Sequence, residues 1–161
     1  MEVSIQTFID NYSSETFDKI KFDWNGKHGD ELIDNNLEFR LKLLEHISSD
    51  IKDINIILIK DLYIELSKLG KEGFGAPKYF NILAEELLKR DYKEYLKDYI
   101  EGASKSMDTY LDSGRINIST ELAKEIHHYI LNDFCYKTDF QEKDLNLFAE
   151  RFRILSEKTK K

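Results

Sequence analysis

The chain has 161 residues, of which 41% are hydrophobic and 34% are charged, and its formal net charge is −7 at pH 7. This length and balance exclude a disordered chain and predict a single helical domain over residues 1–161. The acidic charge argues against nucleic-acid binding, which needs Lys and Arg side chains to displace counterions from phosphates.

Cysteine usage and the apolar pattern exclude further classes of protein. Cys135 is the only cysteine, so neither an intramolecular disulfide nor a cysteine-based zinc site can close. No apolar run approaches the roughly 20 residues that a membrane-spanning helix needs. The start, Met1-Glu2-Val3-Ser4-Ile5, lacks the basic and apolar regions of a signal peptide. We therefore expect a cytoplasmic protein with no membrane contact.

The N-terminal segment, residues 1–28, is the least regular part of the chain. Apolar residues follow helical spacing over residues 3–12, partly alternate over residues 17–24, and give way to a turn cluster at residues 25–29. This pattern fits a short helix followed by either an extended segment or the end of a second helix. Elsewhere, one proline and seven glycines leave little room for long loops.

From residue 30 onward, apolar residues recur at helical spacing in six stretches. We predict an all-α fold of six to seven helices in successive antiparallel pairs, as a helical bundle or a short solenoid-like array. The expected pairs are 30–48 with 55–69, 77–90 with 91–107, and 119–135 with 139–156. The buried stripe expected in the first helix is Ile33, Leu37, Leu41, Leu44 and Ile47. The basic tail, residues 157–161, is expected to fray.

Turn-forming and capping residues mark the expected helix ends. Gly70 suits the end of the helix over 55–69, and Pro77 suits the first turn of the next helix. The spacing of a capping box occurs at Asp91-Tyr92-Lys93-Glu94 and at Thr138-Asp139-Phe140-Gln141. Ser119 is expected to cap the helix that follows it.

Three motifs suggest chemistry, and each has a plainer explanation. Glu125-Ile126-His127-His128 contains one Glu-x-x-His step, whereas di-iron bundles use two such steps and two further Glu residues. The glycines of the segment 70–75 lack both a preceding strand and the Lys-Ser/Thr ending of a phosphate loop. Cys135 has no recognisable oxyanion element near it. We therefore expect no catalytic residue, no metal ligand and no cofactor.

Acidic and aromatic residues on the outer helix faces are the candidates for binding. Asp61 and Glu65 lie one helical turn apart, so both carboxylates are expected on one face. Interfaces often combine aromatic anchors with a polar rim, and Tyr110 lies near the same segments. An ordinary solvated face is the alternative explanation. The predicted partner-binding residues are Asp61, Tyr63, Glu65, Glu72, Phe74, Asp98, Glu101 and Asp108.

Part of the chain resembles small helical immunity proteins of bacterial contact-dependent growth inhibition and related polymorphic toxin systems. The resemblance spans residues 26–112 and rests on Lys27-His28-Gly29-Asp30-Glu31-Leu32, Asp61-Leu62-Tyr63-Ile64-Glu65-Leu66 and Lys71-Glu72-Gly73-Phe74-Gly75. It implies a bacterial protein without enzyme activity that binds the C-terminal domain of a cognate toxin and occludes its active site. Nuclease toxins are usually basic because they bind nucleic acid, so an acidic inhibitor fits an RNase-type partner.

Two other interpretations stay open. One is a helical scaffold or adaptor that has no toxin partner. The other is a metal-dependent helical-bundle enzyme. The resemblance favours the immunity protein, acting by stoichiometric occlusion of the toxin.

Overall fold

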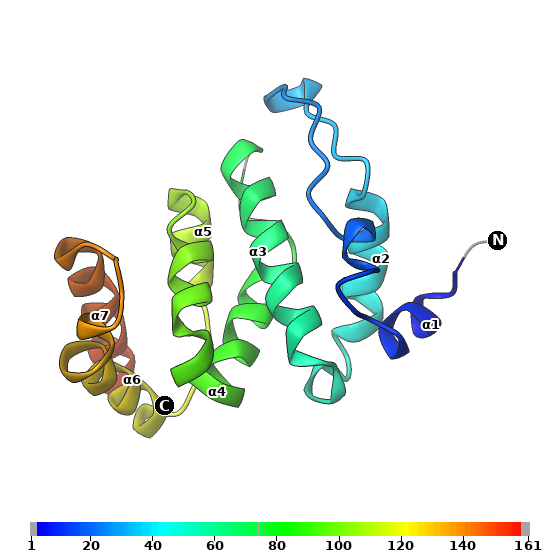
Figure 1. Cartoon of the computed structure of the whole chain (residues 1–161). Helices are drawn as coiled ribbons and strands as arrows, with labels where there is room; N and C mark the ends of the chain where they lie inside the picture. Colours follow the sequence, from blue (N-terminus) through cyan, green and yellow to red (C-terminus); the bar gives the residue numbers. More distant parts are fainter. Residues whose placement is uncertain (1–2, 74, 159–161) are drawn as a thin grey trace.

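The computed structural model describes residues 3–73 and 75–158 and is all-α. Within these ranges it has seven α-helices and no β-strand, which confirms the predicted fold class. Figure 1 shows the helices side by side in a row that follows chain order, from α1 and α2 at one end to α6 and α7 at the other. The packed helix pairs of this row are those of a helical bundle.

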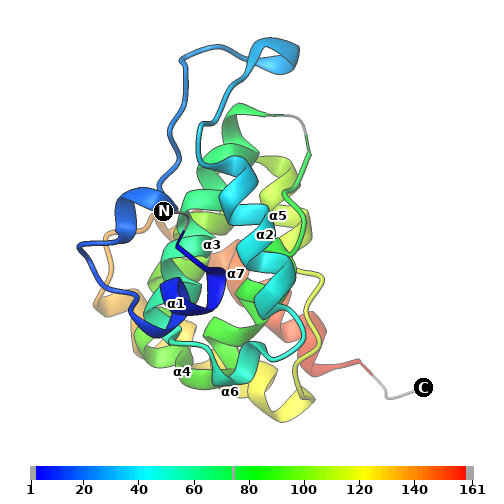
Figure 2. The same ribbon diagram turned by 90° about the vertical axis from the view of Figure 1, so that its right-hand side faces the viewer.

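The N-terminal part consists of two helices and an extended segment between them. Helix α1 (Ile5–Asp10) packs against α2 (Leu37–Ile47). Residues 21–34, which we call the arm, contain a short 3₁₀ turn at Gly29–Glu31 and an isolated β-bridge between Trp24 and Asp34. The arm projects beyond the ends of the helices (Figures 1 and 2).

The predicted helix over residues 30–48 begins later, at Leu37. Asn25 explains the difference, because its backbone N–H donates to the carbonyl of Ile33 and its side-chain oxygen accepts the N–H of Ile33. These bonds hold residues 30–34 in the arm instead of a helix. Ile33 is therefore 56% exposed, and Leu41 is 38% exposed on the outer face of α2. The side chains that α2 buries are Arg40, Leu43, Leu44 and Ile47.

Helix α3 (Ile56–Glu72) follows α2 and runs in the opposite direction (Figure 1). The side chain of Asn55 accepts the N–H of Ile57 and caps its start. The predicted end at Gly70 is wrong, because the helix continues to Glu72. A Cβ at position 70 would lie 2.6 Å from Cγ2 of Thr109, so this glycine permits close packing between helices. Pro77 precedes the next helix, and its carbonyl accepts the N–H of Phe80.

Helix α4 (Phe80–Ala103) reverses direction at Asp91, whose φ of −160° and ψ of 82° are not helical. The Asp91 carboxylate accepts the N–H of Glu94 at 3.2 Å, which is one of the two bonds of the predicted capping box. The rings of Phe80 and Tyr99 both stack on Tyr63, with centroids 4.5 and 6.4 Å away. In a straight helix these two residues would be about 28 Å apart. The two segments of α4 are therefore the predicted antiparallel pair.

Three helices complete the chain. Helix α5 (Met107–Ser113) was not predicted as a separate helix, and it begins with a capping box between Ser106 and Thr109. Helix α6 (Thr120–Asn132) is capped by Ser119, as predicted. It packs along α7 (Glu142–Ser156), which confirms the last predicted pair. The predicted capping box at residues 138–141 does not form, because α7 begins one residue after it and its N-cap side chain makes no capping bond.

A buried aromatic cluster joins these helices. The hydroxyl of Tyr63 donates to the carbonyl of Tyr99 at 2.7 Å, and the hydroxyl of Tyr99 donates to the carbonyl of Ser113 at 2.9 Å. Phe148 and Phe152 of α7 pack against the Tyr99 ring. The cluster therefore fixes α3, α4, α5 and α7 relative to one another and sets which of their faces remain exposed.

Candidate protein-binding surface

The structure removes two of the predicted residues from any binding surface. Tyr63 is fully buried in the aromatic cluster, and Glu65 is only 2% exposed. The Glu65 carboxylate accepts the backbone N–H of Phe22 at 2.7 Å and the Lys68 ammonium at 2.6 Å. The spacing of α3 places Asp61 and Glu65 on one face, but the base of the arm covers Glu65. Phe74, the other predicted aromatic contact, lies outside the described residues.

Three of the predicted residues come together across α3 and α4. Asp98 and Glu101 lie one turn apart on the second segment of α4, and their charges interact. Lys60 joins them to Asp61, because it forms an ion pair with Asp61 at 3.0 Å and interacts with the charge of Asp98. We call Asp61, Asp98 and Glu101 the acidic patch. Its three carboxylates outnumber the two ammonium groups that act on them, those of Lys60 and Lys97, so its net charge is negative.

Burial and neighbouring charges both shift the pKa values of Asp98 and Lys60 in the acidic patch. Burial raises the pKa of Asp98, the charge of Lys60 opposes this shift, and the charge of Glu101 adds to it. Burial alone would lower the pKa of Lys60, but the hydrogen bond and charge of Asp61, together with the charge of Asp98, raise it above its ordinary value. The charges of Asp61 on the same helix and of Asp98 on α4 therefore both favour the protonated form of Lys60.

Two tyrosines that the sequence did not single out border the acidic patch. The hydroxyl of Tyr12 donates to Asp61 at 2.6 Å, and burial followed by this bond raises the pKa of Tyr12. Tyr95 lies one turn before Asp98. The pKa of Tyr95 is raised, because burial and the charge of Glu94 outweigh the opposing charge of Lys60. Helical spacing from Asp98 could have identified Tyr95. No local signal points to Tyr12, which is 49 residues from Asp61.

The two remaining predicted residues lie apart from this group. Glu72 is partly buried near the end of α3, where its carboxylate is 3.4 Å from Nδ1 of His28 on the arm and 3.8 Å from the Lys71 ammonium. Asp108 is exposed in the first turn of α5. Within the described part of the chain, neither residue has a hydrogen bond or ion pair to the acidic patch.

The histidines and the cysteine considered for chemistry have structural partners. Nδ1 of His127 is 2.8 Å from the carbonyl of Ala149, and the exposed His128 pairs with Asn132. The Cys135 thiol donates to the carbonyl of Leu131 at 3.2 Å. Among residues 3–73 and 75–158, no group of three or more His, Cys, Asp or Glu side chains is arranged to hold a metal ion.

Comparisons with protein-family models, curated proteins and solved structures found no match to this chain. No helix in the described ranges is both long enough and apolar enough to cross a bilayer.

Proposed function

We propose that this protein is a bacterial immunity protein that binds the basic C-terminal domain of a cognate toxin and blocks its active site or substrate surface. The acidic patch is the observation that supports this proposal. Its three carboxylates come from two helices that the core fixes rigidly, so their spacing is set before a partner arrives. A preorganised field of one sign speeds encounter with a surface of the opposite sign.

The chemistry of the patch suits Lys and Arg side chains of a partner. Glu101 is exposed, Asp98 is half-buried, and Tyr12 and Tyr95 add aromatic surface at the edge. Burying carboxylates against a partner is favourable only when cations pair with them. A basic domain supplies those cations, whereas an acidic or apolar partner would leave the carboxylates uncompensated.

A nuclease is the toxin class that best matches this surface. Nucleases that bind RNA or DNA need basic side chains along the substrate path. An acidic helical surface placed over that path competes directly with the phosphates of the substrate. The net charge of −7 supports the same partner, and an RNase acting in the cytoplasm is the working hypothesis.

The test is titration calorimetry of the full chain against the C-terminal domain of the protein encoded immediately upstream, at low and high salt. We expect tight one-to-one binding that weakens as salt rises, because salt screens exposed charge pairs. Absence of binding would reject the proposal and favour an adaptor that has no toxin partner. Tight binding that is insensitive to salt would keep the inhibitor but remove the acidic patch from its interface.

A matched pair of variants tests the acidic patch itself. Glu101→Lys is expected to slow association about tenfold, because it reverses an exposed charge inside the complementary field. Glu45→Lys makes the same change at an exposed position of α2 outside the patch and is expected to leave the association rate nearly unchanged. Equal effects of the two substitutions would show that only the net charge of the protein matters.

A further inference from the structure

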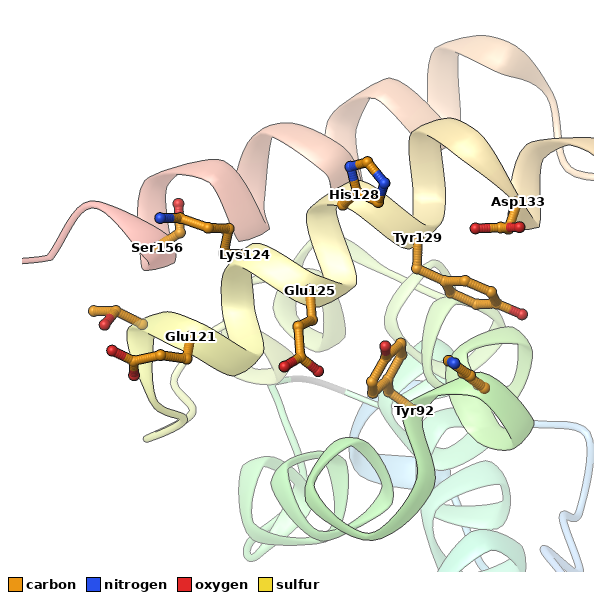
Figure 3. Close-up of a pocket in the computed structure, with 10 residues that line it drawn as sticks. Tyr92, Glu121, Lys124, Glu125, His128, Tyr129, Asp133 and Ser156 are labelled. Carbon is orange, nitrogen blue, oxygen red and sulfur yellow. The ribbon is translucent and has the colours of Figure 1, made fainter.

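The start of the second segment of α4 and one face of α6 enclose a groove with a volume of about 540 Å³. Figure 3 shows this groove and the side chains that line it. Tyr92 of α4 and Tyr129 of α6 lie within it edge to face, with ring centroids 5.5 Å apart and an interplanar angle of 74°. Both tyrosines are only partly buried, so the groove offers aromatic surface to a ligand.

Two carboxylates accompany this tyrosine pair. Glu125 points into the space beside Tyr92, and Asp133 lies at the end of α6 near Tyr129 (Figure 3). Both acids are exposed, and neither forms an ion pair with another described residue. Burial raises the pKa of the Tyr92 hydroxyl, and the charges of Glu125 and Asp133 raise it further. The charges of both acids therefore reach the Tyr92 hydroxyl.

The basic side chains that line the groove do not neutralise these acids. Lys124 and His128 point away from Tyr92 (Figure 3). The Lys93 ammonium lies 6.0 Å from the centroid of the Tyr92 ring, and the ammonium of Lys137, which does not line the groove, lies 5.9 Å from that of Tyr129. These distances are at the outer limit of a cation–π contact. The rings thus attract cations, and a cation inside the groove would also reach the free carboxylates.

We propose that this groove binds an arginine side chain of a partner protein, with its guanidinium stacked on the tyrosine pair and paired with Glu125 and Asp133. Arginine fits better than lysine because its planar group stacks on aromatic rings, forms paired hydrogen bonds with carboxylates and is weakly hydrated. The groove shares no residue with the acidic patch, so this site does not depend on the proposed function.

The probe is the capped peptide acetyl-Gly-Arg-Gly-amide, titrated into the ¹⁵N-labelled full chain and followed by two-dimensional NMR. We expect saturable shifts confined to the amides around Tyr92 and along the groove face of α6. A peptide with citrulline in place of arginine has nearly the same shape without the charge and is expected to cause no shift. A lysine peptide is expected to bind several-fold more weakly.

Two double variants distinguish binding at the groove from general attraction between the arginine peptide and an acidic protein. Glu125→Gln with Asp133→Asn is expected to weaken binding of the arginine peptide roughly fivefold, since exposed charge pairs are individually weak. Asp139→Asn with Glu142→Gln removes the same two charges at exposed positions outside the groove and should leave affinity unchanged. The spectra also report whether each variant is folded. No shift with the arginine peptide, equal shifts with the citrulline peptide, or equal losses in both double variants would overturn the proposal.

Discussion

The carboxylate of Glu65 on α3 accepts a hydrogen bond from the backbone N–H of Phe22 at 2.7 Å and so attaches the base of the arm to the helix it crosses. Lys68 donates to the other carboxylate oxygen at 2.6 Å. A buried carboxylate is tolerated only when hydrogen bonds and a counterion replace its hydration, and Glu65 has both. Glu65 is therefore a positioning residue of the fold.

Replacing Glu65 with Ala is expected to lower the free energy of unfolding by about 2–3 kcal/mol, because it leaves the Phe22 N–H without its acceptor. Glu65→Gln should cost less, since its amide oxygen can still accept that bond. Urea denaturation measures both losses, and hydrogen exchange at the Phe22 amide should accelerate in the Ala variant. The exposed Glu101→Ala is the control, with an expected change within about 0.5 kcal/mol. Equal losses at positions 65 and 101 would contradict this role.

Gly102 of α4 packs against the buried Tyr63 ring. A Cβ at this position would lie 2.4 Å from Cε1 of Tyr63 and 2.8 Å from its Cζ. Gly102→Ala is therefore expected to destabilise the protein by about 1–3 kcal/mol, despite the higher helix propensity of alanine. Thermal or urea denaturation measures the loss. Ser104→Ala, at the exposed C-cap of the same helix, should change stability far less.

A double-mutant cycle identifies the cause of that loss. If the ring edge opposes the new methyl group, Gly102→Ala should cost less in a Tyr63→Leu background, where the clashing atoms are absent. An undiminished cost in that background would attribute the loss to the helix backbone instead of the contact with Tyr63.

The elements that local patterns define were predictable from the sequence. Helical spacing identified the segments around Asp91, and the capping serine at 119 begins α6 where expected. The prediction of a helix over residues 30–36 was wrong. Ile33 has the spacing of a helical residue, but it forms hydrogen bonds with Asn25 across the arm. Such a pairing between separate segments leaves no periodic signal in either one.

The candidate surface was predictable only in part, for the same reason. Asp61, Asp98 and Glu101 were identified as acidic positions on helix faces. In the fold, Lys60 links Asp61 to Asp98, and Asp98 interacts with the charge of Glu101. Glu65 has the same local character as Asp61, but a segment more than 40 residues away covers it. Periodicity shows which residues share a face, and only the tertiary structure shows which faces are covered.

Asp98 is expected to make stability depend on pH. Its pKa is raised in the folded protein, chiefly by burial, so the folded state binds a proton at a higher pH than the unfolded state does. Above the raised pKa the buried charge of Asp98 destabilises the folded state. As pH falls toward the ordinary aspartate pKa near 4, the folded state binds the proton before the unfolded state does, and the penalty disappears. Asp98→Asn should therefore be more stable than the natural chain at pH 7, and the difference should shrink as pH falls.

Urea denaturation at several pH values between about 4 and 7 measures this difference. Glu45→Gln, at an exposed position of α2 outside the acidic patch, serves as the control and should show a smaller change across the same range. A stability difference for Asp98→Asn that is constant with pH would show that the amide acts through packing and not through the proton.

Arg40 and Asp34 form a fully buried ion pair at the base of the arm. Arg40 also donates to the carbonyls of Ile20 and Lys21, each at 3.1 Å, so it holds both ends of the arm. Arg40→Met should destabilise the protein by about 3–5 kcal/mol, because it leaves the Asp34 carboxylate buried without its counterion. Adding Asp34→Asn removes that charge and should recover part of the loss. Urea denaturation of the two single variants and the double variant measures the coupling, and losses that simply add would show that the two side chains act independently.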